Sequence, residues 1–141
     1  MADWRTVRFD PTYEEPLDPS IITLCDALQA AGFNTASSCC GHGQDWPRVS
    51  WDSATPDQAC EALARYLLKR SGGDYKSFTP WVQKEILEDG HRWMIEIHIH
   101  DTYCDTPPAK AFAAANMAIL AVAKHIREWE AARELARKVA S

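Results

Sequence analysis

The chain has 141 residues, of which 46% are hydrophobic, enough for one domain to bury its own core without disulfides or metal ions. Its formal net charge of −5 disfavours broad binding to nucleic-acid backbones, which requires a dense basic surface. No apolar run approaches the roughly 18 residues of a membrane span and the N-terminus lacks a signal-peptide pattern, so we expect one cytoplasmic domain over residues 1–141.

The first part of the chain predicts an edge strand followed by a helix. Residues 4–10 alternate between apolar and polar side chains, as an edge strand does, and the acidic, proline-containing stretch 14–16 closes that strand. Asp18 and Pro19 form an N-cap followed by proline at the first helical position, and Gly32 supplies a C-terminal stop. The apolar side of this helix consists of Ile21, Leu24, Cys25, Leu28 and Ala31.

Two short strands flank a glycine-rich loop in the middle of the chain, and a second helix follows them. Residues 34–39 are typical of an extended run and residues 47–52 of a strand, and we expect the two to pair. Thr55 and Pro56 repeat the cap-and-proline signal, and the Ser-Gly-Gly stretch 71–73 ends the second helix. Its buried side is predicted to be Ala59, Cys60, Leu63, Tyr66 and Leu67.

A hairpin and a long helix complete the predicted fold. Residues 79–88 fit either a short helix or a strand, and we favour the strand because Asp89-Gly90 is a strong turn signal between apolar runs. Residues 93–100 alternate cleanly, and a long helix follows the break at Pro107-Pro108. We therefore predict an α+β domain in which helices pack on a mainly antiparallel sheet. The alternation predicts a packed face of Trp93, Ile95, Ile97 and Ile99, and a second face of Met94, Glu96, His98 and His100.

The long C-terminal helix also indicates self-association. Its apolar residues recur at steps of three and four, and its alanine-rich surface would let a second helix approach closely. A helix of this length should extend beyond a sheet of short strands, so we predict a homodimer in which the apolar stripe contacts a second copy. The alternative is that the stripe covers its own sheet. The stripe consists of Phe112, Ala115, Ile119, Val122, Ile126 and Trp129.

The clearest functional signal is the stretch 35–43, which concentrates thiols, hydroxyls and an imidazole where the backbone turns freely. Gly41 and Gly43 flank His42, and glycine lets backbone N–H groups approach a ligand closely. With Arg48 nearby to meet an anion, these donors suit a small anionic or nucleotide-like ligand. The predicted ligand-binding residues are Thr35, Ser37, Ser38, Cys39, Gly41, His42, Gly43 and Arg48.

Two adjacent thiols lie in the same stretch. Strand alternation would point Thr35, Ser37 and Cys39 to one face, and Cys40 to the other. The chain has five cysteines, an odd number, and needs no disulfide, so we expect reduced thiols. A thiol beside His42 suggests a Cys/His hydrolase, but this chemistry requires the side chains to meet in space and an orienting Asn or Asp.

Two groups of side chains suggest a zinc site: the thiols with His42 on the loop, and Glu96, His98 and His100 along one strand. A strand that carries His-x-His aims both imidazoles the same way, and Zn²⁺ accepts N, S and O ligands from distant segments. Because the chain has no Cys-x-x-Cys or His-Glu-x-x-His spacing, the alternative for the strand group is a polar, half-exposed sheet face. The predicted metal ligands are Cys39, Cys40, His42, His98 and His100.

Two resemblances involve the same loop. Residues 22–35, continuing into the Ser-Cys-Cys-Gly-His-Gly sequence 38–43, resemble a group of small phage and prophage proteins with a helix, a Gly-aromatic link and an S-C-C-G-H-G loop. This resemblance implies a phage setting, and therefore the cytoplasm of a host cell. The stretch 35–41 is also similar to the T-x-S-S-C-S-G segment of the methyltransferase family that acts in wybutosine synthesis on transfer RNA. The matching residues are Thr35, Ser37, Ser38, Cys39 and Gly41, whereas Cys40 replaces the serine and His42 the basic residue of that family.

We therefore expect a phage-type protein that binds a small ligand without turnover, for instance by sequestering a nucleotide-like signal of host defence. The enzyme alternative is methyl transfer on RNA or zinc-assisted hydrolysis that uses Cys39, Cys40 and His42. A structural or partner-binding module is the third alternative. The absence of a phosphate-binding glycine loop or dinucleotide fingerprint from the sequence disfavours a conventional nucleotide hydrolase or redox enzyme.

Overall fold

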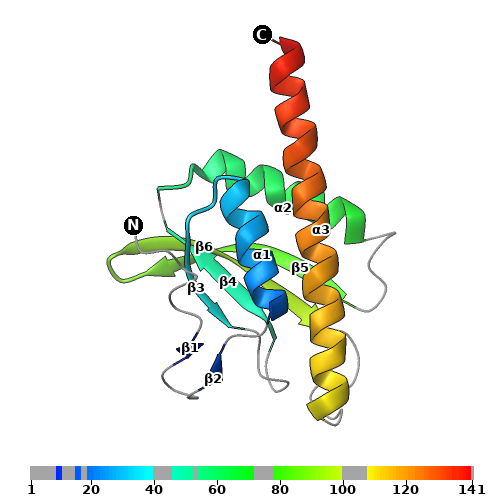
Figure 1. Cartoon of the computed structure of the whole chain (residues 1–141). Helices are drawn as coiled ribbons and strands as arrows, with labels where there is room; N and C mark the ends of the chain where they lie inside the picture. The colour runs from blue at the N-terminus through cyan, green and yellow to red at the C-terminus, as the bar shows by residue number, and fades with distance from the viewer. Residues whose placement is uncertain are drawn as a thin grey trace.

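In the part of the chain that the structure describes, a sheet of four antiparallel strands carries three helices on one of its faces (Figure 1). The computed structural model describes residues 9–10, 15–16, 19–39, 46–52, 54–71, 78–99 and 108–140. The strands, in the order β3-β4-β6-β5, are β3 (Thr35–Cys39), β4 (Arg48–Trp51), β6 (Gly90–Ile99) and β5 (Phe78–Leu87). The helices are α1 (Pro19–Ala30), α2 (Asp57–Ser71) and α3 (Pro108–Ala140). The predicted α+β fold is therefore confirmed.

Two further strands pair near the N-terminus. Strand β1 (Phe9–Asp10) runs antiparallel to β2 (Glu15–Pro16). The sequence predicted a longer strand over residues 4–10, of which 4–8 lie outside the described residues. It also predicted that stretch 14–16 only closes this strand, and that prediction is wrong. Both strands of a two-stranded ladder are edge strands, the kind of strand in which proline is tolerated.

Helix α1 ends at the glycine that the sequence predicts as its stop. Gly32 has a φ of +94°, a left-handed conformation that favours glycine. The Gly32 N–H donates to the Gln29 carbonyl at 3.0 Å, and the Phe33 N–H donates to the Leu28 carbonyl at 2.9 Å. These two bonds define a Schellman motif, and Leu28 and Phe33, the two residues whose apolar contact usually accompanies it, are both buried in the same core. The motif turns the chain from α1 toward β3.

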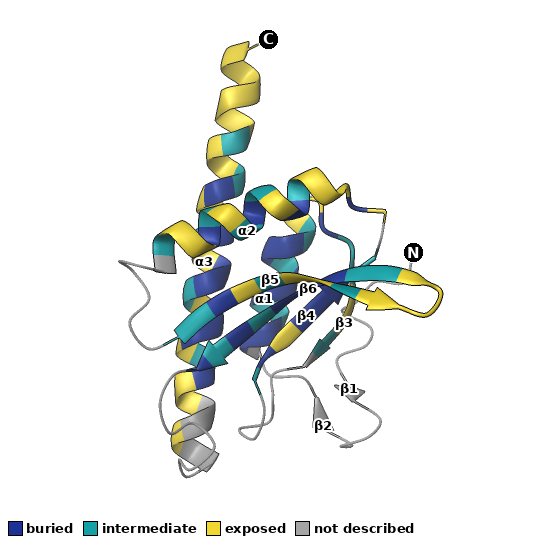
Figure 2. Ribbon diagram, turned by 180° about the vertical axis from the view of Figure 1, so that it is seen from behind, coloured by how far each residue is buried: buried dark blue, intermediate teal, exposed yellow. Residues whose placement is uncertain are grey.

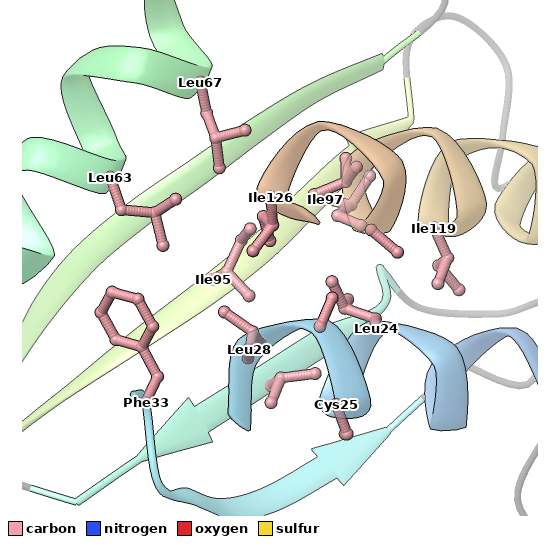
Figure 3. Close-up of a cluster of buried hydrophobic side chains, with 14 of the residues drawn as sticks. Leu24, Cys25, Leu28, Phe33, Leu63, Leu67, Ile95, Ile97, Ile119 and Ile126 are labelled. Atoms are coloured by element: carbon pink, nitrogen blue, oxygen red, sulfur yellow. The ribbon is translucent and has the colours of Figure 1, made fainter. Parts of the chain in front are cut away.

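One hydrophobic core lies between the helices and the sheet (Figure 3). Leu24 and Leu28 extend from α1 toward Ile95 of β6 and Ile126 of α3, and all four are fully buried. The packed faces predicted for the first two helices and for β6 are confirmed, with only Ala31, Ala59 and Tyr66 partly buried. The same core explains why the β5–β6 hairpin, rather than a short helix, forms over residues 78–99, because β6 needs a partner on the side away from β4.

The apolar stripe of α3 packs in the core of its own chain. Ile119, Val122 and Ile126 are fully buried, Trp129 is 8% exposed, and the Trp129 ring stacks on Phe33 with 6.0 Å between centroids. Our prediction that these residues contact a second copy is therefore wrong, and the alternative, in which the stripe covers its own domain, is confirmed. The Phe112 side chain lies outside the described residues. A homodimer stays a prediction, but without these buried residues as its contacts.

The C-terminal part of α3 extends beyond the rest of the domain (Figure 1). Leu135 and Val139 on this part are 63% and 79% exposed. Among the described helices, α3 included, none combines the length and the apolar character that crossing a bilayer requires.

A polar cluster connects the β5–β6 hairpin to the start of α2. Asp57, the first residue of α2, accepts hydrogen bonds from Trp93 Nε1 at 2.9 Å and from Lys84 Nζ at 3.0 Å. His91 Nε2 lies 3.6 Å from the same carboxylate. The hydrogen bonds from Trp93 and then Lys84 hold the pKa of Asp57 below its ordinary value. The helix N-terminus also favours a negative charge at this position.

Truncation of the α3 stripe should destabilise the protein strongly. We expect Ile126→Ala to lower the free energy of unfolding by about 2–5 kcal/mol, because it leaves a cavity in a close-packed core. Leu135→Ala, on the exposed end of the same helix, is the matched control and should change it by less than about 0.5 kcal/mol. Urea denaturation followed by circular dichroism measures both. Equal losses would contradict the burial of the stripe.

The Asp57 cluster predicts a pH-dependent stability. Because its pKa is lower in the folded protein than its ordinary value of 3.8, ionised Asp57 stabilises the fold above that pH, and this contribution is lost as pH falls through the folded pKa. We expect Asp57→Asn to be less stable than wild type in urea at neutral pH, with the difference shrinking in strongly acidic buffer. Glu88→Gln, at the exposed hairpin turn, is the control. A difference that stays constant with pH would contradict this account.

Candidate functional site

The predicted glycine loop lies only partly within the described residues. Cys40, Gly41, His42 and Gly43 lie outside them, as does His100, so these assignments stay predictions. The strands on either side are described, and β3 pairs with β4 antiparallel, as the sequence predicts. The site can therefore be built from the sheet that supports the loop.

A register shift in β3 separates hydroxyls that alternation would place together. The shift falls between Thr35 and Ser37, so that Thr35 pairs with Trp51 while Ser37 pairs with Ser50. Thr35 Oγ1 accepts a hydrogen bond from Gln29 Nε2 of α1 at 3.1 Å, whereas the Ser37 and Ser50 hydroxyls bond each other. The prediction that Thr35 and Ser37 share a face is wrong, because one extra residue in a strand reverses the direction of every side chain beyond it.

Ser38 also faces the helices. It pairs with the fully buried Val49, and its side chain hydrogen-bonds the Cys25 thiol of α1. Burial raises the pKa of Cys25 to about 11, although the hydrogen bond with Ser38 acts in the opposite direction. Burial likewise raises the pKa of Cys60, whose Sγ accepts a hydrogen bond from Trp51 Nε1 at 3.2 Å. Both thiols are protonated core groups at neutral pH, as the apolar stripes predict. Ser38 is half-buried, and its role in ligand binding stays a prediction.

The sheet has a second face opposite the helices, and exposed residues occur along β4 and β5 (Figure 2). Side chains alternate along a strand, so Glu96 and His98 lie on the side opposite Ile95, Ile97 and Ile99. The cross-strand register extends this surface onto the neighbouring strands. The surface, called the outer face here, consists of Ser37, Trp46, Arg48, Ser50, Thr79, Trp81, Gln83, Met94, Glu96 and His98.

An imidazole lies between two indoles on the outer face. The His98 ring stacks on Trp46, just before β4, with 4.0 Å between centroids and 22° between planes. Trp81 of β5 lies 5.9 Å from the same ring. His98 Nε2 and Glu96 Oε1 are 2.7 Å apart. A carboxylate accepts hydrogen bonds, so the tautomer of His98 with its proton on Nε2 can donate to Glu96. These contacts hold both the imidazole and the carboxylate in one orientation.

A single row of side chains crosses three strands on this face. Arg48 of β4 is opposite Glu96 of β6, which is opposite Trp81 of β5. Neighbouring strands are about 4.8 Å apart, so this cross-strand row (Arg48, Glu96 and Trp81) spans roughly 10 Å. It presents a cation, an anion and an aromatic surface side by side. Arg48 is exposed and Trp81 is 45% exposed, whereas Ser50 and Met94 nearby are buried.

Sequence reasoning identified Arg48, Glu96 and His98 as chemically capable but missed Trp46 and Trp81. A usable signal was present for Trp81. A two-residue turn at Asp89-Gly90 places Trp81 opposite His98, on the polar face of the hairpin. In the structure Leu87 pairs with Gly90, so the turn is Glu88-Asp89 and Trp81 is opposite Glu96, on the same face. Trp46 gave no comparable signal, because its place beside His98 depends on where β4 starts.

The zinc prediction is not tested by the described residues. Among them, no group of three His, Cys, Asp or Glu side chains could hold a metal ion. Glu96 and His98 offer two possible metal ligands, and these are hydrogen-bonded to each other. The other predicted ligands lie outside the described residues, as does the Cys39 side chain.

No protein-family model matches this chain, and neither does any curated protein or solved structure. The resemblances to phage proteins and to the wybutosine-synthesis methyltransferases stay predictions. The case for function therefore depends on the chemistry of the outer face.

Proposed function

We propose that this protein binds a small, planar, anionic ligand of nucleotide type on its outer face and does not transform it. The observation that carries this proposal is the cross-strand row, in which an aromatic surface and a guanidinium lie on either side of a carboxylate. If the predicted phage setting holds, sequestration of a nucleotide-like signal of host defence is the corresponding biological role.

Trp81 supplies a stacking surface. It is 45% exposed, so much of the indole is available to a ligand instead of being buried in the core. A nucleobase stacked on an aromatic side chain gains about 1–3 kcal/mol, and any heteroaromatic ring can use this contact. The His98 ring lies beside the Trp81 indole, and the Trp46 ring stacks on His98, so the three rings form one aromatic surface, called the platform here.

Arg48 supplies the charge that an anionic ligand requires. Its planar guanidinium can donate two parallel hydrogen bonds to a phosphate or carboxylate, with more geometric specificity than a lysine. It is exposed on β4, two strands away from Trp81. A ligand with a ring at one end and an anionic group at the other therefore fits the row along its length.

Binding without turnover agrees with the state of the nucleophiles and bases in the described residues. The Cys25 and Cys60 thiols are buried and protonated, which makes them poor nucleophiles. His98 already stacks on Trp46 and bonds Glu96, and these two contacts fix its ring as part of the aromatic platform. These contacts favour a binding surface over a catalytic centre.

Loss of the platform should weaken ligand binding without unfolding the protein. We expect Trp81→Ala to weaken the binding of nucleoside monophosphates about tenfold, the order of effect that stacking supports. Isothermal titration calorimetry measures it. Gln83→Ala, on the same strand and face but outside the row, is the control and should bind as wild type does.

Arg48→Ala should weaken binding and reduce its dependence on salt, because the contact with the anionic group is electrostatic. Circular dichroism confirms that each variant is folded. Wild-type protein that binds no nucleoside monophosphate would contradict the proposed function, as would a Trp81→Ala variant that binds with wild-type affinity.

A further inference from the structure

We infer that the outer face selects a ring with two adjacent N–H donors, as guanine has, and that Glu96 recognises them. The inference rests on the proposed function, because it names the ligand class of the same site. It depends on the position of Glu96 within the cross-strand row and on the contact that orients its carboxylate.

Glu96 lies where the edge of a stacked ring would be. It is directly opposite Trp81, and opposed residues of an antiparallel pair have Cβ atoms about 4.5–5.5 Å apart. A ring that stacks on Trp81 therefore has one edge beside the carboxylate. An ionised carboxylate has two oxygens that only accept hydrogen bonds, and the single bond to His98 leaves acceptor capacity for a ligand.

The donor pattern of guanine fits two acceptors. Its edge presents N1–H and the exocyclic N2–H side by side, so a carboxylate can accept both in a charge-assisted, two-point contact. Adenine and cytosine each place one acceptor beside one donor, and uracil flanks its single N–H with two acceptors. With those rings, one carboxylate oxygen would face another acceptor. That oxygen would lose its hydrogen bond with water and gain none with the ligand.

His98 is a positioning residue for Glu96. Its Nε2 lies 2.7 Å from Glu96 Oε1, and its ring stacks on Trp46 at 4.0 Å. The two paired side chains are 26% and 20% exposed, so water competes only partly for the bond. A carboxylate that is already oriented loses less conformational freedom when the ligand binds, which favours affinity and selectivity.

The row also gives the ligand a direction. A carboxylate alone would repel a phosphate, but Arg48 lies on the side of Glu96 away from Trp81. The ring should therefore lie over β5. Because the ribose is attached at N9, remote from the N1–H and N2–H edge that Glu96 contacts, the phosphate meets Arg48 only when the nucleotide folds back toward Glu96 in its syn form. The Glu96 carboxylate repels an anionic ligand unless the base donates hydrogen bonds to it. This repulsion is a second reason to favour guanine.

The test compares GMP, IMP, AMP, CMP and UMP by isothermal titration calorimetry with wild-type protein. We expect GMP to bind at least about tenfold more tightly than AMP, a difference of the size that distinguishes a made from an unmade charge-assisted contact. IMP retains N1–H but lacks the exocyclic amine, so it should fall between them.

Variants assign the selectivity to Glu96. Glu96→Gln replaces one acceptor with a donor and should reduce the GMP-to-AMP ratio toward one, while AMP affinity stays within about threefold because Trp81 is unchanged. Glu85→Gln is the matched control, since Glu85 lies on the neighbouring strand but bonds Arg92. For His98, the donor-retaining variant His98→Gln should keep more of the ratio than His98→Ala.

The outcomes separate this inference from the proposed function. Equal binding of all five nucleotides, or a preference for AMP, would overturn guanine selection and leave the binding function standing. Binding of none would overturn both. Equal losses of GMP and AMP binding in a folded Glu96→Gln variant would show that Glu96 does not recognise the base, and would also overturn the inference.

Discussion

The structure depends on the strict alternation of side chains along β6, one of the two central strands of the four-stranded sheet. Ile95, Ile97 and Ile99 must face the helices, because the core closes on them. Since successive side chains point to opposite faces, this requirement places Glu96 and His98 together on the outer face. The core therefore dictates the position of the candidate site. A shift of one residue in the pairing of β6 would bury a carboxylate and an imidazole, at a cost that the fold could not support.

The elements that could be predicted from sequence are those whose signals are local. The proline that starts α1 and the Gly32 stop each depend on a few neighbouring residues, and both occur as expected. The hairpin also forms as predicted, but its turn is Glu88-Asp89, one residue earlier than the Asp-Gly signal indicates, because Gly90 pairs with Leu87. The directions of Thr35 and Ser38 could not be predicted, because the register shift in β3 arises from pairing with β4. The role of the α3 stripe was also ambiguous, because an apolar helix face looks the same whether its own chain or a second copy covers it.

The candidate site differs from the one that the sequence made prominent. The glycine loop is prominent in the sequence because of its unusual composition. The outer face is not, because the sheet brings its aromatic residues together from three separate segments, which carry Trp46, Trp81 and His98. Rigid strands position these groups more firmly than a loop would, which suits a site that recognises a ring by stacking and by its edge. The loop follows β3 in the chain and lies outside the described residues, so the ligand contacts predicted for His42 stay a prediction.

The central claim is that the outer face, and not the helical side, binds the ligand. Amide and indole chemical shifts of ¹⁵N-labelled protein, recorded by NMR during titration with GMP, test it most directly. The account predicts that the largest changes fall on the Trp81 indole and on the amides of Arg48, Glu96 and His98, with little change along α1. Saturable changes centred on the helices, with the signals of these four residues unmoved, would contradict it.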